Sequence, residues 1–394
     1  MIAVIADDLS GAAEIAGLAL RYQLNVEMTT AACLQTTAEV LVVSMDTRSM
    51  NAEDAIVATK KTVAALMELN PSFLYKKIDS VLRGHILDET KIQLKETGLD
   101  TALIIPANPS LGRTIVDGQY YVDGKLIHQT AFSNDPEFAV TSSDPIQMLR
   151  DDESSVIVGK KEQVLPRAGI VIGEVADGGD LEAWASLTVN KKIMLAGAGD
   201  FFMALLDANH FGKKPSQISF VDYQRVYPFL IVSGTSFTKS VEAIRNTKSA
   251  GGPVCYMPAV IFSSDKINEE AIEAWSQEIV SVLEKNAAAI VAIDNTMKGT
   301  AEALYLRSVT AACVKKVLDK IQVKELYIEG GSTAAAIIDQ LGICQFFPEN
   351  ELARGVIRMR VAYHQPLHIT IKPGSYPNPA GLFSFTISET KHAL

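Results

Sequence analysis

The sequence predicts an α/β protein with two domains built on largely parallel sheets. Short apolar runs that end in polar loops alternate with helical stretches along most of the chain, which is the pattern of parallel strands covered by helices on both faces. The length of 394 residues suits two or three domains at about 100–200 residues each. A polar, mixed segment at 210–227 interrupts the alternation, so we predict domains at 1–220 and 221–394.

The first strand is the apolar run Ile2–Ala6, which meets Asp7 and Asp8 directly. No basic segment precedes it, so we read it as a central strand and not as a signal peptide. No apolar run reaches the ~18 residues of a membrane span. We therefore expect a soluble, cytoplasmic protein with no membrane partner.

The other elements of the first half follow from the same signals. A helix at 12–22 is followed by a strand at 39–44, and Asn51 with two acidic residues behind it suits the start of a helix at 51–69. Gly98 suits the end of a helix at 88–98, and a strand follows at 101–105. Asp123-Gly124 predicts a β-hairpin over 116–128, and the segment 132–143 reads as irregular and exposed. Strands at 170–172 and 193–195 flank a helix that contains Trp184.

The second half repeats this alternation. Strands are expected at 228–232, 290–293, 325–329 and 367–371, and helices from 237, at 270–285, 308–320 and 334–341. A partial dinucleotide fingerprint, Gly197-x-Gly199, lacks its third glycine because Phe202 stands there, so it is a weak signal.

Composition limits the class of partner. The formal net charge is -10, which argues against nucleic acid, because binding a phosphate backbone requires a basic face. A small anionic substrate needs only a local basic pocket. The four cysteines show no Cys-x-x-Cys spacing and read as reduced thiols. The histidines form no ligand pattern, since Pro366 separates His364 from His368, and we predict no metal-ligating residues.

The stretch from Tyr75 to Gly84 is the strongest candidate for a substrate site. It reads as a short strand that runs into a loop, and it places Lys77, Asp79 and Arg83 within a few residues. So many charges at a strand end are costly unless they bind something polar, and arginine and lysine suit an anionic substrate. The alternative is a surface salt-bridge cluster around Asp79.

Two further loops carry polar groups to strand ends. Of Asp7 and Asp8, we expect one to cap the following helix and the other to be functional. The loop 106–114 is shaped by proline and glycine and carries Asn108 and Arg113.

Three loops of the second half suit a bound anion. Gly330-Gly331-Ser332-Thr333 opens a helix, where free N–H groups and the helix dipole favour phosphate. The alternative is an ordinary helix start capped by Ser332 or Thr333. The loop 233–236 exposes backbone N–H groups where a helix begins, and we expect the run Lys372-Pro373-Gly374, which follows a strand, to form a wall of the same site.

Several motifs together resemble the four-carbon acid sugar kinase family. They are Ile-Ala-Asp-Asp-Leu-Ser-Gly-Ala at 5–12, Lys-Lys-Ile-Asp-Ser-Val-Leu-Arg-Gly at 76–84 and Pro-Ala-Asn-Pro-Ser-Leu-Gly-Arg-Thr at 106–114. In the second half, the motifs at 233–235, 330–334 and 372–374 occupy the places of the nucleotide-binding motifs of that family. The resemblance implies an N-terminal sugar-acid-binding domain, a C-terminal nucleotide-binding domain and a cleft between them.

The implied reaction moves the γ-phosphoryl group of ATP, with Mg²⁺, onto the terminal hydroxyl of a four-carbon acid such as threonate, erythronate or 3-oxo-tetronate. The expected catalytic residues are Asp79, Asp7 and Lys77, with Asp79 or Asp7 as general base. The expected substrate-binding residues are Asp8, Ser10, Ser80, Arg83, Asn108 and Arg113. The expected ATP-binding residues are Ser233, Gly234, Ser236, Gly330, Gly331, Ser332, Thr333 and Gly374.

The chain departs from that family at Ser332, where an acidic residue is usual, and at Pro373. These departures leave open a second function, a sugar-acid-binding protein or sensor that has lost ATP turnover. A third, a dinucleotide-dependent dehydrogenase, is disfavoured by the broken Gly197-x-Gly199 motif and the absence of a suitable ribose-binding acid. The oligomeric state is also open, with a homodimer among the candidates.

Overall fold

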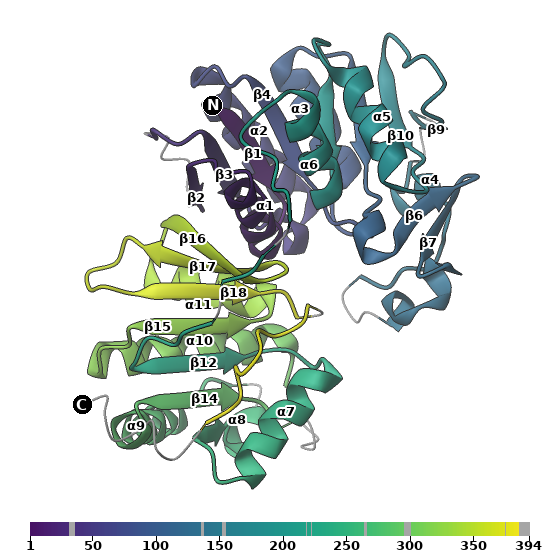
Figure 1. Ribbon diagram of the computed structural model, residues 1–394. Coiled ribbons are helices and arrows are strands. Elements are labelled where there is room, and N and C mark those ends of the chain that lie inside the picture. Colours follow the sequence, from purple (N-terminus) through teal and green to yellow (C-terminus); the bar gives the residue numbers. More distant parts are fainter. Residues whose placement is uncertain are drawn as a thin grey trace. The chain divides into compact units, whose positions relative to one another are not determined.

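The computed structural model describes all residues except 31–35, 135–137, 152–154, 218, 222, 264–265, 295–300, 375 and 386–394 (Figure 1). By its internal contacts the chain divides into two compact units, Met1–Gln217 and Ile218–Leu394.

The sheet of the N-terminal unit is parallel, with strand order β2-β3-β1-β4-β11-β5-β10-β9. The strands are β1 (Ile2–Ala6), β2 (Val26–Thr29), β3 (Val40–Ser44), β4 (Phe73–Lys77), β5 (Thr101–Ile105), β9 (Val156–Gly159), β10 (Gly169–Gly173) and β11 (Met194–Gly197). Every residue of β1 and β3 is buried, because helices cover both faces of the sheet.

Figure 1 shows α1, α5 and α6 on one face of this sheet and α2 and α3 on the other. Their bounds are α1 (Leu9–Arg21), α2 (Ala52–Glu68), α3 (Ile86–Thr97), α5 (Gly178–Thr188) and α6 (Gly199–Ala208). A short helix, α4 (Pro145–Met148), precedes β9. Asn51 caps α2 through a bond from the Asp54 amide, and Gly98 ends α3 in the left-handed region at φ 66°. Both boundaries follow from local sequence, as predicted.

The predicted hairpin at 116–128 is a three-stranded antiparallel sheet of β6 (Arg113–Val116), β7 (Gln119–Val122) and β8 (Lys125–Leu126). Asp123-Gly124 makes the predicted turn between β7 and β8. Asp117-Gly118 makes a second turn that we expected to lie within a strand, and both of its residues have positive φ. Part of the segment 132–143 is buried, at Val140 and Ser143, so its prediction as exposed is wrong there, while 135–137 lie outside the described residues.

The sheet of the C-terminal unit has the order β13-β14-β12-β15-β18-β17-β16. Its parallel strands are β12 (Phe229–Ser233), β13 (Val254–Tyr256), β14 (Ala288–Ala292), β15 (Glu325–Glu329) and β18 (His368–Lys372). An antiparallel pair, β16 (Gln345–Ala353) and β17 (Val356–Val361), extends this sheet. We did not predict that pair, because residues such as Pro348 and Asn350 break the alternation of strand residues.

The helices of this unit are α7 (Thr238–Ser249), α8 (Ala259–Phe262), α9 (Glu269–Asn286), α10 (Ala303–Lys320) and α11 (Gly331–Leu341). Ile244 of α7 packs with Phe229, Ile231 and Val254 in a buried core. The predicted α/β class with largely parallel sheets is confirmed, with helix starts corrected by two to five residues for α1, α3, α10 and α11.

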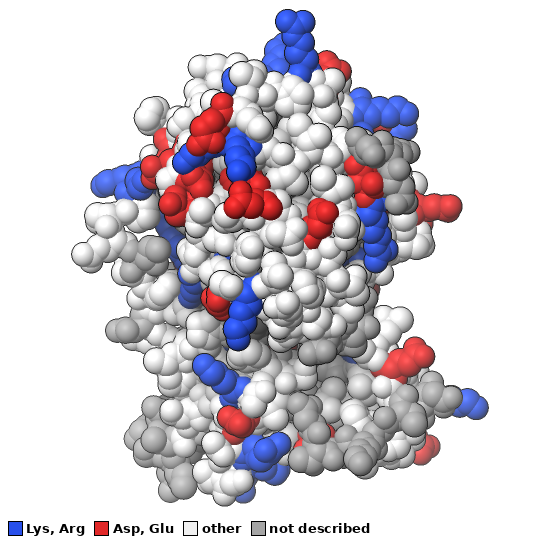
Figure 2. Space-filling model, turned by 90° about the vertical axis from the view of Figure 1, so that its right-hand side faces the viewer, with Lys and Arg blue, Asp and Glu red and all other residues white. Residues whose placement is uncertain are grey.

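Two surface properties bear on partners. On the face that Figure 2 shows, basic and acidic side chains are interspersed, and the described residues there form no broad basic area. Among the described residues, none of the helices combines the length and the apolar character needed to cross a bilayer.

Candidate functional site

The N-terminal candidate site lies at the carboxyl edge of β1, β3 and β4. These strands end in register, since Ala6 pairs with both Ser44 and Lys77. The loops that follow them therefore leave the sheet at one edge, which is where open α/β sheets bind ligands. These loops carry Asp7 and Asp8, Arg48, and the stretch 78–85.

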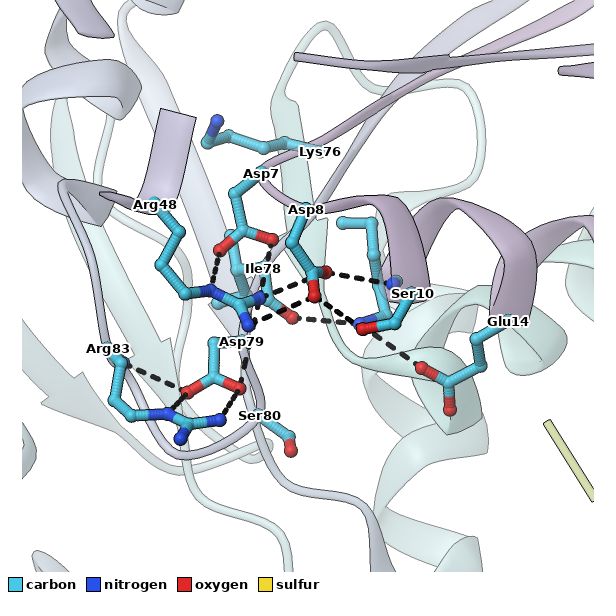
Figure 3. A network of polar contacts seen from close by, with 12 residues as sticks. Asp7, Asp8, Ser10, Glu14, Arg48, Lys76, Ile78, Asp79, Ser80 and Arg83 are labelled. Atoms are coloured by element: carbon cyan, nitrogen blue, oxygen red, sulfur yellow. Dashed lines mark hydrogen bonds and ion pairs between the residues drawn. The ribbon is translucent and has the colours of Figure 1, made fainter. Parts of the chain in front are cut away.

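Arg48 holds three carboxylates together at this edge. Its Nε and Nη2 donate to the two carboxylate oxygens of Asp7 at 3.0 Å each, and its Nη1 donates to Asp8 at 3.1 Å. Its Nη2 also lies 3.9 Å from Asp79. Figure 3 shows the guanidinium between these carboxylates. A planar fork of five donors suits this arrangement better than a lysine would.

Asp79 is held from its other side by Arg83. The Arg83 Nε and Nη2 donate to the two carboxylate oxygens at 2.7 and 3.0 Å (Figure 3). We call Arg48, Asp7, Asp8, Asp79 and Arg83 the Arg48 network. The Asp7 and Asp79 side chains are only 3% and 9% exposed and the Arg83 side chain 22%. Asp79 is therefore the centre of a salt-bridge cluster, as the alternative expected, but the cluster is part-buried and does not lie on the surface.

Asp8 is the residue that caps α1. It accepts a bond from the Gly11 amide at 2.8 Å and another from the Ser10 hydroxyl. The predicted cap is therefore Asp8. Arg48 contacts both aspartates, and a functional role for Asp7 stays a prediction. Gly11 is required here, because a Cβ on it would lie 2.6 Å from the Asp8 carboxylate and 3.2 Å from the Lys77 Nζ.

The two lysines of the motif point to opposite faces of the sheet, as predicted from the strand period. The Lys77 Nζ lies 3.2 Å from a carboxylate oxygen of Glu14 and donates to the carbonyl of Ile78 at 3.1 Å. The Lys76 side chain is fully buried and pairs with Glu89 of α3. The Lys77 side chain thus lies at the same edge of the sheet as the Arg48 network, and the Lys76 side chain lies on the opposite face of the sheet.

The loop 106–114 sends Arg113 and not Asn108 toward this site. The Arg113 Nη1 donates to the Ser80 hydroxyl, and the Arg113 and Arg83 guanidinium carbons lie 5.5 and 5.9 Å from the centre of the Phe132 ring. The Asn108 amide, in the orientation that satisfies both groups, donates to Asp200 at 2.7 Å. Asn108 therefore shapes its own loop, and a role in contacting substrate stays a prediction for it.

The three carboxylates of the Arg48 network differ in pKa. Burial raises the pKa of Asp7 to about 6, although Arg48 acts in the opposite direction. Burial also acts to raise the pKa of Asp79, but Arg83 and Arg48 outweigh it and hold that pKa well below its ordinary value. The pKa of Asp8 is likewise lowered, because Arg48 and Lys77 outweigh its burial. Asp7 is therefore the carboxylate best suited to exchange a proton near neutral pH.

The C-terminal candidate site lies at the carboxyl edge of β12, β15 and β18. Their last residues form one row across the sheet, because Ser233 pairs with Glu329 and Glu329 pairs with Lys372. The loops that follow, 233–236, 330–333 and 373–374, are here called the phosphate loops. Their glycines are those that the sequence singled out.

A fully buried ion pair lies beneath these loops. The Lys372 Nζ donates to Glu329 at 2.6 Å and also to the carbonyls of Pro373 and Gly374 at 3.1 and 3.0 Å. Glu329 accepts further bonds from the hydroxyls of Ser233, at 2.8 Å, and Ser240. The pair therefore links all three strands to the loops that leave them.

The phosphate loops approach one another too closely for larger residues. A Cβ on Gly234 would lie 1.9 Å from the Thr333 hydroxyl, and a Cβ on Gly374 would lie 2.8 Å from the Thr235 hydroxyl. Gly330 has a φ of 107°, which disfavours any side chain.

The start of α11 leaves backbone donors at these loops. Its N-cap is Gly330, which makes no side-chain cap bond, so the predicted alternative of a cap by Ser332 or Thr333 is wrong. The first amides of α11 are thus oriented as an anion site requires. Ser236 and Ser332 are exposed beside them, and Thr333 is buried.

Sequence reasoning missed Arg48, Glu329 and, as a named site residue, Lys372. Arg48 follows the strand 39–44 by only a few residues, so its place at a strand end was a usable signal. Glu329 and Lys372 terminate apolar strands, and a charge at that position of a buried strand requires a partner.

Comparison with known proteins gives two domain matches. Residues 2–205 match the model of a sugar-binding N-terminal domain, and residues 230–379 match that of a nucleotide-binding C-terminal domain. The two matches together span most of the chain.

Curated relatives match over nearly the whole chain. The chain is 24% identical to a D-threonate kinase of Salmonella typhimurium, covering 89% of this chain and 88% of that protein. It is also 24% identical to a 3-oxo-tetronate kinase of Actinobacillus succinogenes, over 95% of this chain and 96% of that protein.

Solved structures share the fold. A Haemophilus influenzae protein matches with a TM-score of 0.70 at 19% identity, over 95% of this chain and 97% of that one. A Salmonella typhimurium protein described as a putative tRNA synthase matches with a TM-score of 0.75 at 17% identity, over 100% of this chain and 99% of that one.

Proposed function

We propose that this chain, which belongs to the four-carbon acid sugar kinase family and matches a sugar-binding and a nucleotide-binding domain, is an ATP- and Mg²⁺-dependent kinase. Its substrate would be a four-carbon sugar acid such as threonate, erythronate or 3-oxo-tetronate. The N-terminal unit would bind the acid and the C-terminal unit would bind the nucleotide.

The observation that carries this proposal is the construction of the phosphate loops. Three neighbouring strands end in one row, a buried ion pair fixes the loops behind them, and glycines at 234, 330 and 374 allow the loops to approach one another closely. A backbone cradle at a helix N-terminus is suited to the phosphates of a nucleotide. The phosphates of the nucleotide would be held by Ser233, Gly234, Ser236, Gly330–Thr333 and Gly374.

The donor set beside the phosphate loops also fits a magnesium ion. A small pocket is lined by Ser233, Thr235 and Asp294 among others, which supplies the hydroxyl and carboxylate oxygens that Mg²⁺ prefers. Among the described residues, no cluster of three or more acidic, histidine or cysteine side chains is placed to hold a metal by itself. We therefore propose that Mg²⁺ is held largely by the phosphates of ATP, whose charge it would neutralise.

The N-terminal unit would bind and orient the acid. Arg83 and Lys77 would attract its carboxylate and hydroxyls, and Asp8, Ser10, Ser80 and Arg113 would orient its hydroxyls. Asp7 would accept the proton of the attacking hydroxyl, because its pKa of about 6 lies nearest to neutral pH. Asp79 is the weaker candidate for the base, since its lowered pKa makes it a poor proton acceptor.

The test is an assay of acid-dependent ADP release. Purified protein would be given Mg-ATP and, separately, D-threonate, erythronate and 3-oxo-tetronate. We expect at least one acid to raise ADP release well above the rate with ATP alone. No rise with any of them would remove the kinase proposal.

A second candidate function is a sugar-acid-binding protein without ATP turnover. Ser332 favours it, because this exposed position at the start of α11 usually carries an acidic residue in the family and here carries none. Calorimetry separates the two functions. Binding of D-threonate together with ATP binding supports the kinase, whereas D-threonate binding without ATP binding supports the sensor.

A further inference from the structure

A pocket of about 370 Å³ lies beside Arg83 within the N-terminal unit. One wall is formed by residues 81–85, which continue from the Asp79 loop. The other wall is formed by 138–142 together with Gln147, Met148 and Arg150. Its volume falls in the range usual for small-molecule sites, about 300–1,000 Å³.

The lining of this pocket is basic, although the whole chain carries a net charge of -10. Arg83, His85 and Arg150 line it, and no Asp or Glu does among the described residues. Arg83 is paired with Asp79, so much of its charge is already balanced. Arg150 is exposed and forms no ion pair with any described residue. Arg150 thus supplies a positive charge that would draw an anion into the pocket.

The neutral part of the lining suits a hydroxylated acid. The Ser142 hydroxyl donates to the Gln147 side-chain oxygen at 2.9 Å, which leaves the amide nitrogen of Gln147 as a donor for a ligand. The Thr141 hydroxyl adds a further polar group, and Val140 and Met148 supply apolar surface. Donors mixed with apolar surface bind a small polyol acid better than a bare metal or a purely apolar ligand.

We propose that this pocket receives the carboxylate end of the sugar acid, and that Arg150 binds the carboxylate beside Arg83, which leaves the hydroxyls to Lys77. Arg83 connects the pocket with the Arg48 network, since it lines the pocket and also donates to Asp79. An acid anchored by Arg150 would extend past Arg83 toward the Arg48 network. This inference rests on the proposed function and adds the direction in which the substrate lies.

The test is calorimetric binding of D-threonate, and separately of inorganic phosphate, to the full-length protein and three variants. Arg150→Gln removes the charge, Arg150→Lys keeps it without the planar fork, and Arg167→Gln removes an exposed arginine elsewhere on the same unit. We expect Arg150→Gln to raise the Kd for D-threonate by about tenfold or more. Arg150→Lys should have a smaller effect, and Arg167→Gln should behave as the unchanged protein.

Unchanged D-threonate affinity in Arg150→Gln would overturn the inference. So would a loss confined to inorganic phosphate, because the pocket would then serve a phosphate group and not the carboxylate. Failure of the proposed function would give a different result. The unchanged protein would still bind D-threonate more tightly than Arg150→Gln does, but it would release no ADP. In a working enzyme, Arg150→Gln should raise the KM for the acid and leave the KM for ATP unchanged.

Discussion

The proton-accepting role of Asp7 makes a prediction that separates it from Asp79. Asp7 can accept a proton only in its ionised form, and burial raises its pKa to about 6. Activity should therefore rise as pH increases through that value and level off above it. Because one pH unit changes the ratio of the two forms tenfold, kcat/KM at pH 5 should be about tenfold below the plateau.

The alternative base gives a different profile. The pKa of Asp79 lies well below its ordinary value, because Arg83 and Arg48 outweigh its burial. If Asp79 were the base, kcat/KM would stay flat from pH 8 down to pH 5. The assay is initial-rate ADP release across this range at saturating Mg-ATP, with the acid varied and the fold monitored by circular dichroism.

Substitution of Asp7 tests the same assignment of the base. Asp7→Asn removes the proton acceptor and should lower kcat by about 10²- to 10⁴-fold. D-threonate binding, measured by calorimetry, serves as a control that the Arg48 network still forms. A flat pH profile together with an Asp7→Asn variant of near-normal kcat would refute the reasoning.

Three further predictions concern other parts of the account. Arg83→Ala removes the bidentate partner of Asp79 and should raise the KM for the acid far more than the KM for ATP. Equal increases in the two KM values, measured by steady-state kinetics, would mean that Arg83 does not belong to the acid-binding site. Gly234→Ala puts a Cβ 1.9 Å from the Thr333 hydroxyl and should raise the KM for ATP, whereas Gly178→Ala, which meets nothing within 4 Å, should leave it unchanged. Lys372→Met leaves Glu329 as a buried unpaired charge and should cost about 3–5 kcal/mol in urea unfolding. The double variant Lys372→Met with Glu329→Gln should cost less, and an equal cost would mean that the ion pair does not brace the loops.

The sequence predicted the frame of each sheet because its signals are local. Apolar runs marked β1, β3, β5, β12 and β15, while Asn51 and Gly98 marked helix ends. The pair β16 and β17 was not predicted, because its apolar residues alternate imperfectly and its bulges shift the register. Such irregular strands are specified by their neighbours more than by their own pattern.

The candidate site was predicted only in part, for a physical reason. The motif 76–84 identified Asp79 and Arg83, and strand alternation separated Lys76 from Lys77. Arg48 was missed, because its role arises from the parallel pairing of β1 with β3, which brings residues about 40 positions apart together. The roles of Asn108 and Glu329 likewise depend on side-chain partners distant in sequence, Asp200 and Lys372.

Phosphorus NMR of one reaction mixture tests the central claim most directly. The protein would be incubated with Mg-ATP and D-threonate, or with each other four-carbon acid in turn, while the phosphate signals are followed. The account predicts that ADP and a new phosphate-monoester signal grow in equal amounts with at least one acid. ADP accompanied only by inorganic phosphate, or no ADP with any acid, would contradict it.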